Sequence, residues 1–182
     1  MAKWQEPINM KVLTTLRVLL YYENIFIKYL LFRYGPGGRL QDWWTQSTLD
    51  LFTARAKNLE NQYSNLSLGG SKVDGHITMG ENIADNGGMK VSYSAAFPKS
   101  EDGKRIAKGS EGLGLTLEQL FFVSYAQVWC NANTEEYEVA KMESHNPHPP
   151  SKLRVEAVVA NSEPFAKAFK CPNKGVPRSG VW

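Results

Sequence analysis

The segment from Thr116 to Trp129, TLEQLFFVSYAQVW, constrains the fold more than any other part of this 182-residue chain. Thr116, followed by Glu118 and Gln119, marks a helix start. The apolar side chains that follow cover most of the helix circumference; they are Leu120, Phe121, Phe122, Tyr125, Val128 and Trp129. Because a helix that is apolar nearly all round must be buried, the rest of the chain has to supply a core around it.

Start signals and helical spacing predict further helices on both sides of this segment. The first spans residues 43–63 with Asp42 as N-cap, and the second follows Thr78, with Ile83, Met89 and Tyr93 facing a core. A third spans residues 134–144 and starts at Thr134. The last spans residues 162–170, with Ser162 as N-cap and Pro164 in the first turn. Residues 64–75, 98–114 and 145–150 are predicted loops, and residues 154–160 are predicted to be extended. The pattern predicts one mainly α-helical unit with long loops.

Residues 12–32 are strongly apolar, but the charged side chains of Arg17, Glu23 and Lys28 interrupt them. Each charge would cost about 2.5–3.5 kcal/mol near a bilayer centre, and no small-residue cleavage site marks a signal peptide. The spacing of the polar residues favours an amphipathic helix. We expect it to be buried in the fold, with a membrane-surface helix as the alternative. The run Gly35-Pro36-Gly37-Gly38 ends it.

The charge balance excludes one class of partner. Lys plus Arg number 21 against 18 Asp plus Glu, which gives a formal net charge of +3. No run of five like charges and no RNA- or DNA-binding motif is present, so nucleic acid is not expected as a partner.

Glu81 and Asp85 are four residues apart in the predicted helix after Thr78, so both carboxylates lie on one face, one turn apart. Such a pair by itself usually marks a solvated surface. Its context, GENIADNGG, adds Gly87 and Gly88 inside the helical period, where each costs about 1 kcal/mol relative to alanine. This cost indicates that something must approach the helix closely at these two glycines. A carboxylate ligand with a second carboxylate one turn later suits a zinc site that also contains histidine.

GENIADNGG, with DWWTQ before it and QLFFVSYAQVWC after it, resembles the C-terminal catalytic region of the neprilysin and endothelin-converting-enzyme family of zinc metalloendopeptidases. The resemblance covers about Gly38 to Trp182. It implies the C-terminal part of a thermolysin-like (gluzincin) peptidase domain, one zinc ion as cofactor and peptides as substrates. We therefore divide the chain into an unrelated or alternative N-terminal segment, residues 1–37, and an incomplete peptidase domain, residues 38–182.

The resemblance implies a role for each of four residues. Glu81 matches the third zinc ligand, and Asp85 matches the carboxylate that holds a zinc-binding histidine. His148 and Arg154 keep the family's spacing of a histidine six residues before an arginine. The resemblance implies that His148 stabilises the oxyanion of the tetrahedral intermediate and that Arg154 binds a substrate carbonyl. The aspartate that usually lies two residues before this histidine is Asn146 here.

The family's HExxH motif, which supplies two zinc-binding histidines and the general-base glutamate, does not occur in this sequence. Its three histidines are His76, His145 and His148. On the residues alone, His145 competes with His148 for the oxyanion role. Since catalytic zinc uses three protein ligands and an open position, Glu81 is one recognised ligand of the three. We predict that the chain as given is catalytically incomplete and does not cleave peptides.

The two cysteines, Cys130 and Cys171, are ambiguous by count between free thiols and one bridge. The resemblance implies that in a full-length parent they bridge to cysteines near the start of the ectodomain, which this sequence does not contain. Asn65 begins an N-glycosylation sequon where family members carry one. The family implies a plasma-membrane protein of type II, with an extracellular catalytic domain, or a secreted one.

Two functions follow as hypotheses. The first is an incomplete C-terminal part of a neprilysin-like peptidase, and the second is a non-catalytic module that binds peptides or a protein partner. An incomplete peptidase domain is expected to expose apolar faces around Phe121, Phe122 and Trp129 and to associate with itself through them. A module is expected to stay monodisperse and to melt cooperatively. We favour the first hypothesis.

Overall fold

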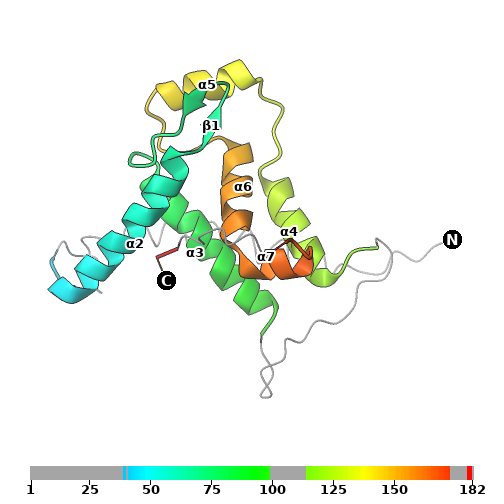
Figure 1. The fold of residues 1–182 in the computed structure, drawn as a ribbon, viewed down its shortest axis with the longest axis horizontal. Helices are drawn as coiled ribbons and strands as arrows, with labels where there is room; N and C mark the ends of the chain where they lie inside the picture. The colour runs from blue at the N-terminus through cyan, green and yellow to red at the C-terminus, as the bar shows by residue number, and fades with distance from the viewer. Residues whose placement is uncertain (1–38, 40, 99–113, 173–179, 182) are drawn as a thin grey trace.

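The computed structural model describes residues 39, 41–98, 114–172, 180 and 181 (Figure 1). The helices in these ranges are α2 (Gln46–Ser64), α3 (Met79–Ala96), α4 (Leu117–Val128), α5 (Glu135–Glu143), α6 (Ser151–Asn161) and α7 (Glu163–Ala168). A hairpin of β1 (Ser67–Leu68) and β2 (Ser71–Lys72) completes them. The prediction of a mainly α-helical unit is confirmed. Within the described ranges, no helix is long and apolar enough to cross a membrane.

Two sequence predictions fall largely outside the described residues. The amphipathic helix expected over residues 12–32 lies entirely outside them, and so do residues 99–113 of the loop expected over 98–114. Both therefore stay predictions.

Helix starts are the local feature that the sequence predicted best. The side chains of Thr116, Thr134 and Ser162 each accept a hydrogen bond from the backbone N–H three residues later, at the starts of α4, α5 and α7. At Thr116 the bond is reciprocal, because the Gln119 side chain accepts from the Thr116 N–H at 2.9 Å. α3 begins directly after Thr78, as predicted.

The start of α2 was predicted wrongly. Asp42 was expected as its N-cap, but the helix begins at Gln46 and Thr45 caps it. The Oγ1 of Thr45 accepts a hydrogen bond from the Thr48 backbone N–H at 3.3 Å. With the helix starting at Gln46, the tryptophan pair lies before it, and Trp44 packs edge-on against Phe52.

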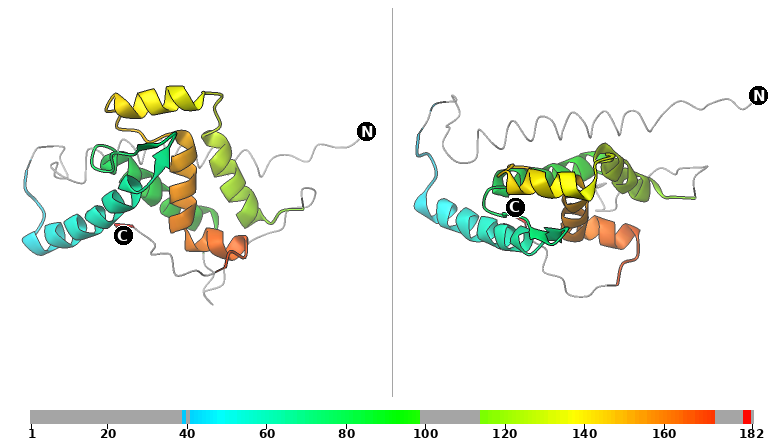
Figure 2. Two further views of the ribbon diagram at one scale, coloured as in Figure 1. Left: turned by 45° about the horizontal axis from the view of Figure 1, so that its top comes forward. Right: turned by 90° about the horizontal axis from the view of Figure 1, so that it is seen from above.

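The hairpin replaces part of the loop predicted over residues 64–75. Its turn is Gly69-Gly70, both with positive φ (55° and 84°), the combination that a two-residue hairpin turn requires. Ser67 pairs with Lys72, and Leu68 with Ser71. α5 packs against both strands, and Figure 2 shows α5 lying across one end of α6 beside the hairpin.

The extended conformation predicted for residues 154–160 is wrong, because these residues belong to α6. Three valines in this stretch favour a strand by propensity. Burial of Leu153, Arg154, Ala157 and Val158 on one helical face outweighs that preference. This helix is what directs Arg154 toward α3.

The core has two apolar clusters, one at the first half of α3 and one at its second half. The first joins α2 to α3 and α6, through residues such as Leu59, Tyr63 and Ile83. The second surrounds α4, where Phe121 and Phe122 pack against Tyr93 of α3, with ring centroids 5.4 and 5.5 Å away.

The second cluster corrects the expectation of exposed apolar faces. Phe121 and Phe122 are only 1% and 2% exposed, and Trp129 is partly buried against the same cluster. α7 contributes the cover, because its Phe165 packs edge-on against Phe122 with centroids 5.2 Å apart. The chain therefore buries these side chains itself, and self-association through them is not supported.

Candidate functional site

Glu81 and Asp85 project from α3 into the interior. Glu81 is 7% exposed and Asp85 is fully buried. They lie one turn apart, as predicted, but the alternative of a solvated surface pair is excluded. Because carboxylates are almost never fully buried without partners, both positions need an explanation in contacts.

Arg154 of α6 is the partner of Asp85. Its Nε donates to Asp85 Oδ2 at 2.5 Å and its Nη2 donates to Oδ1 at 2.6 Å. Nη2 also lies 3.8 Å from Oε2 of Glu81. A guanidinium that meets a carboxylate through two parallel hydrogen bonds is held in one orientation, which a single bond would not achieve.

Burial and pairing shift the pKa values of Asp85 and Arg154 in opposite directions. Burial raises the pKa of Asp85, and the hydrogen bonds and charge of Arg154 lower it, with an upward net direction. Burial lowers the pKa of Arg154, but the hydrogen bond and charge of Asp85 outweigh it and raise that pKa. Since buried charges are costly unless they are fully paired, the two-point geometry is a condition for having them in this core.

Tyr125 of α4 and Trp129, the C-cap residue of that helix, complete the surroundings of Arg154. Its Cζ lies 3.9 Å from the centroid of the Trp129 ring, a cation–π contact. The Tyr125 hydroxyl donates to the Arg154 backbone oxygen at 3.4 Å. From the sequence, both aromatics were predicted only as core residues. Their spacing of four residues, which places them on one face of α4, was the available signal that they share a neighbour.

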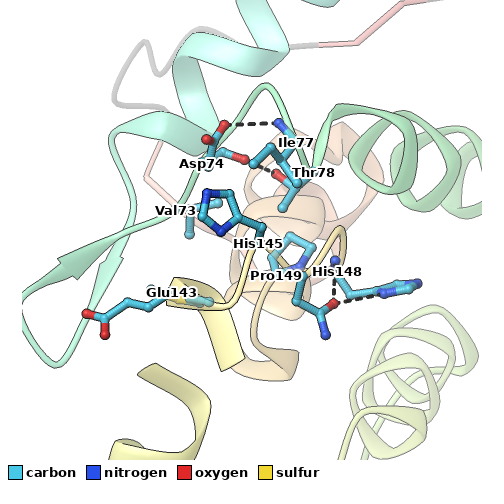
Figure 3. Close-up of a pocket in the computed structure, with 10 residues that line it drawn as sticks. Val73, Asp74, Ile77, Thr78, Glu143, His145, His148 and Pro149 are labelled. Carbon is cyan, nitrogen blue, oxygen red and sulfur yellow. Dashed lines mark hydrogen bonds between the residues drawn. The ribbon is translucent and has the colours of Figure 1, made fainter. Parts of the chain in front are cut away.

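His148 reaches the same place from the loop between α5 and α6. Its Nε2 lies 3.4 Å from Oε2 of Glu81. Its backbone N–H donates to Asn146 Oδ1 at 2.9 Å, and its Nδ1 lies 3.1 Å from the same oxygen (Figure 3). The Asn146 amide oxygen therefore orients the ring at the position where the family carries an aspartate. We call Glu81, Asp85, His148 and Arg154 the site cluster.

A cavity of about 150 Å³ opens beside His148 (Figure 3). Its wall includes Asp74, Thr78, Glu143, His145 and His148. His145 adopts a positive φ of 60°, which is uncommon for a residue other than glycine. Of the two histidines in this loop, the structure brings His148 to Glu81, and His145 lines the cavity.

The described residues do not by themselves fit a catalytic zinc ion. No group of three or more His, Cys, Asp or Glu side chains among them is arranged to hold a metal. Asp85 already gives both oxygens to Arg154. Glu81 and His148 would leave the set one short of the three protein ligands that catalytic zinc uses.

The remaining predicted residues lie away from the site cluster. Cys130, at the end of α4, and Cys171, after α7, are both exposed and free. Asn65 is exposed at the end of α2, and its side chain donates to the Asn61 backbone oxygen at 2.9 Å.

Comparison with known proteins places this chain in a family. The family model "Peptidase family M13" matches residues 27–176. Neprilysin-1 of Caenorhabditis elegans is 43% identical over 138 residues, which are 74% of this chain and 18% of that protein. Endothelin-converting enzyme 1 of Homo sapiens is 41% identical over 139 residues, which are 76% of this chain and 18% of that protein. The chain thus spans less than a fifth of the length of these relatives.

The fold is shared with a solved bacterial structure. The zinc metalloprotease Zmp1 of Mycobacterium tuberculosis superposes with a TM-score of 0.73 and 26% identity, over 94% of this chain and 27% of that chain. The family match covers most of the sequence, and the resemblance seen in the GENIADNGG region is confirmed. On these grounds the chain belongs to peptidase family M13, the family of the neprilysin and endothelin-converting-enzyme zinc metallopeptidases.

Proposed function

We propose that this chain supplies one part of the active site of a zinc metalloendopeptidase, and that the complete enzyme hydrolyses bonds in peptides. The observation that carries the proposal is the convergence of the site cluster from three elements, α3, the loop before α6, and α6 itself. The family resemblance selected the same four residues from separate positions in the chain.

The four side chains differ in their access to a ligand. Arg154, Asp85 and Glu81 have side chains 6%, 0% and 8% exposed, whereas the His148 side chain is 44% exposed. His148 is therefore the most accessible member of the site cluster, and its ring can reach a carbonyl of a bound peptide. An imidazole N–H at that position stabilises the negative charge that develops on a carbonyl oxygen during acyl transfer.

Arg154 has one nitrogen left for a peptide. Nε and Nη2 are engaged with Asp85, and Nη1 makes no hydrogen bond within the described part of the chain. A substrate carbonyl would be held by Nη1 while the other two nitrogens keep the guanidinium in place. The proposed substrate role of Arg154 is thus compatible with its burial.

We also propose that the chain as given neither retains zinc nor cleaves peptides. It contains no HExxH, and the described residues offer no three-ligand set. Metal analysis after dialysis, with cleavage of a quenched peptide followed in the same sample, tests this. No zinc and no cleavage is the expected result. About one zinc per chain, with cleavage that a chelator stops and Glu81→Gln removes, would overturn it.

A chimera tests the positive part of the proposal. Residues of this chain that align with neprilysin-1 of Caenorhabditis elegans would replace their counterparts in that protein, since the two are 43% identical there. If the site cluster is competent, the chimera binds zinc and cleaves peptides, and Glu81→Gln abolishes zinc binding. The His148→Ala variant should keep zinc but lose turnover. A folded chimera that binds no zinc would contradict the proposal.

A secretory location is the third proposal, supported by the family and by the exposure of Asn65 at the turn after α2. Ser67, the acceptor position of the sequon, is exposed as well. Behind a secretion signal, the chain should carry one glycan that a glycosidase removes. Asn65→Gln should abolish the mass shift, and an unshifted parent chain in the medium would refute glycosylation.

A further inference from the structure

The Trp129 ring lies against the guanidinium of Arg154, with Cζ 3.9 Å from the ring centroid. Arg154 is thereby bounded on its edge by Asp85, through two hydrogen bonds, and on one face by the indole. A planar cation held at both edge and face has lost its rotational freedom.

The contact uses the face of the indole and not its N–H. Nε1 of Trp129 is buried and has no hydrogen-bond partner among the described residues. A ring that is placed by its N–H would show such a partner. Trp129 also packs against the α4 cluster and lies beside Tyr125, whose ring centroid is 6.4 Å away and whose hydroxyl pKa burial raises and Trp129 in part lowers.

We infer that Trp129 is a positioning residue, which fixes the plane of the Arg154 guanidinium. In that plane Nε and Nη2 keep their hydrogen bonds to Asp85, and Nη1 keeps one fixed direction. Without the ring, the guanidinium could tilt off the Asp85 carboxylate and toward Glu81, whose Oε2 is already 3.8 Å from Nη2. The significance for peptide binding rests on the proposed function, but the geometry itself can be tested without zinc or peptide.

The first measurement uses the unmodified chain. The δ-protons of Arg154, assigned through its own side-chain carbons by NMR, should be shifted upfield by the ring current of Trp129. Ordinary chemical shifts for these protons would overturn the inference without any variant.

The second measurement compares substitutions at two partly buried tryptophans. In Trp129→Leu, the Arg154 Nε–H should exchange with solvent about tenfold faster, the factor that corresponds to 1.4 kcal/mol. Trp129→Phe keeps a ring face and should retain slow exchange and most of the upfield shift. Trp44→Leu is the matched control, since Trp44 packs against the other cluster and its loss should leave Arg154 unchanged.

The outcomes separate positioning from simple packing. A folded Trp129→Leu chain with the exchange rate of the parent would overturn the inference, as would equal effects of the Trp44 and Trp129 substitutions. If Trp129→Leu does not fold, the Trp129→Phe variant and the upfield shift of the Arg154 δ-protons in the parent chain decide whether the inference holds. Because none of these readouts involves catalysis, a failed peptidase test leaves this inference standing.

Discussion

Arg154 and Asp85, 69 residues apart in the sequence, meet through two parallel hydrogen bonds of 2.5 and 2.6 Å in the interior of the fold. The pair ties α6 to α3, and neither partner has an alternative in water because their side chains are 6% and 0% exposed. Burying such a pair costs free energy, but removing only one partner costs more, because the remaining charge is then buried without a counter-ion.

Asp85→Asn should therefore lower the free energy of unfolding by about 3–5 kcal/mol, because it leaves the Arg154 charge without its counter-ion. Urea denaturation followed by circular dichroism measures this change. Asp50→Asn is the matched control: Asp50 is exposed on α2, and its substitution should change stability by less than about 0.5 kcal/mol. Equal effects at the two positions would show that the ion pair does not stabilise the fold.

Two glycines offer an opposed pair of predictions. A Cβ at Gly75 would lie 2.2 Å from the Glu60 backbone oxygen and 2.4 Å from Ser64 Oγ, whereas a Cβ at Gly80 meets nothing within 4 Å. Gly75→Ala should destabilise the chain by about 1–3 kcal/mol through overpacking against α2. Gly80→Ala should stabilise it by about 0.4–1 kcal/mol, because alanine loses less entropy in a helix. Melting temperatures that move in the same direction would contradict this.

The sequence predicted the parts of the fold that depend on local chemistry. Thr116, Thr134 and Ser162 cap helices through bonds to residues three positions away, so the signal and its effect lie in one turn. α6 was missed for the opposite reason. Its valines favour a strand locally, and the contacts that make it helical come from α3 and α4, which the local pattern does not contain.

The sequence indicated residues that lie together, but not the geometry in which they meet. A motif resemblance named Glu81, Asp85, His148 and Arg154, and these side chains are neighbours in the structure, while their functional roles stay predictions. The pairing of Arg154 with Asp85 and its contact with Trp129 did not follow from the sequence, because each joins residues that only the packing of separate helices brings within reach.

The burial of α4 gives a further prediction. Phe122 is 2% exposed and lies among the rings of Tyr93, Phe121 and Phe165. Phe122→Ala should lower the free energy of unfolding by about 3–5 kcal/mol. Leu51→Ala is the control, because Leu51 is 62% exposed and should contribute less than about 0.5 kcal/mol. If both variants melt like the parent, the α4 cluster is not packed as described.

Stability should fall in alkaline solution because of two buried tyrosines. Tyr63 and Tyr125 are fully buried, and burial, aided by the nearby Asp85 charge, raises the pKa of each above its ordinary value. A phenol with a raised folded-state pKa gives its full stabilisation below the unfolded-state pKa of about 10 and loses it as the pH rises further. Above that pH, only the unfolded chain releases these protons. Each tyrosine should then remove about 1.4 kcal/mol of unfolding free energy per pH unit.

The comparison of two variants isolates this effect from other groups that titrate at high pH. Tyr63→Phe cannot ionise at that position, so its unfolding free energy should decline less steeply than that of the parent above pH about 10, by about 1.4 kcal/mol per unit. Tyr137→Phe is the matched control, because Tyr137 is 57% exposed, and its curve should run parallel to that of the parent. Parallel curves for Tyr63→Phe and the parent would mean that Tyr63 ionises as readily in the folded chain as in the unfolded one, which is incompatible with a buried hydroxyl that accepts a hydrogen bond from Asn86.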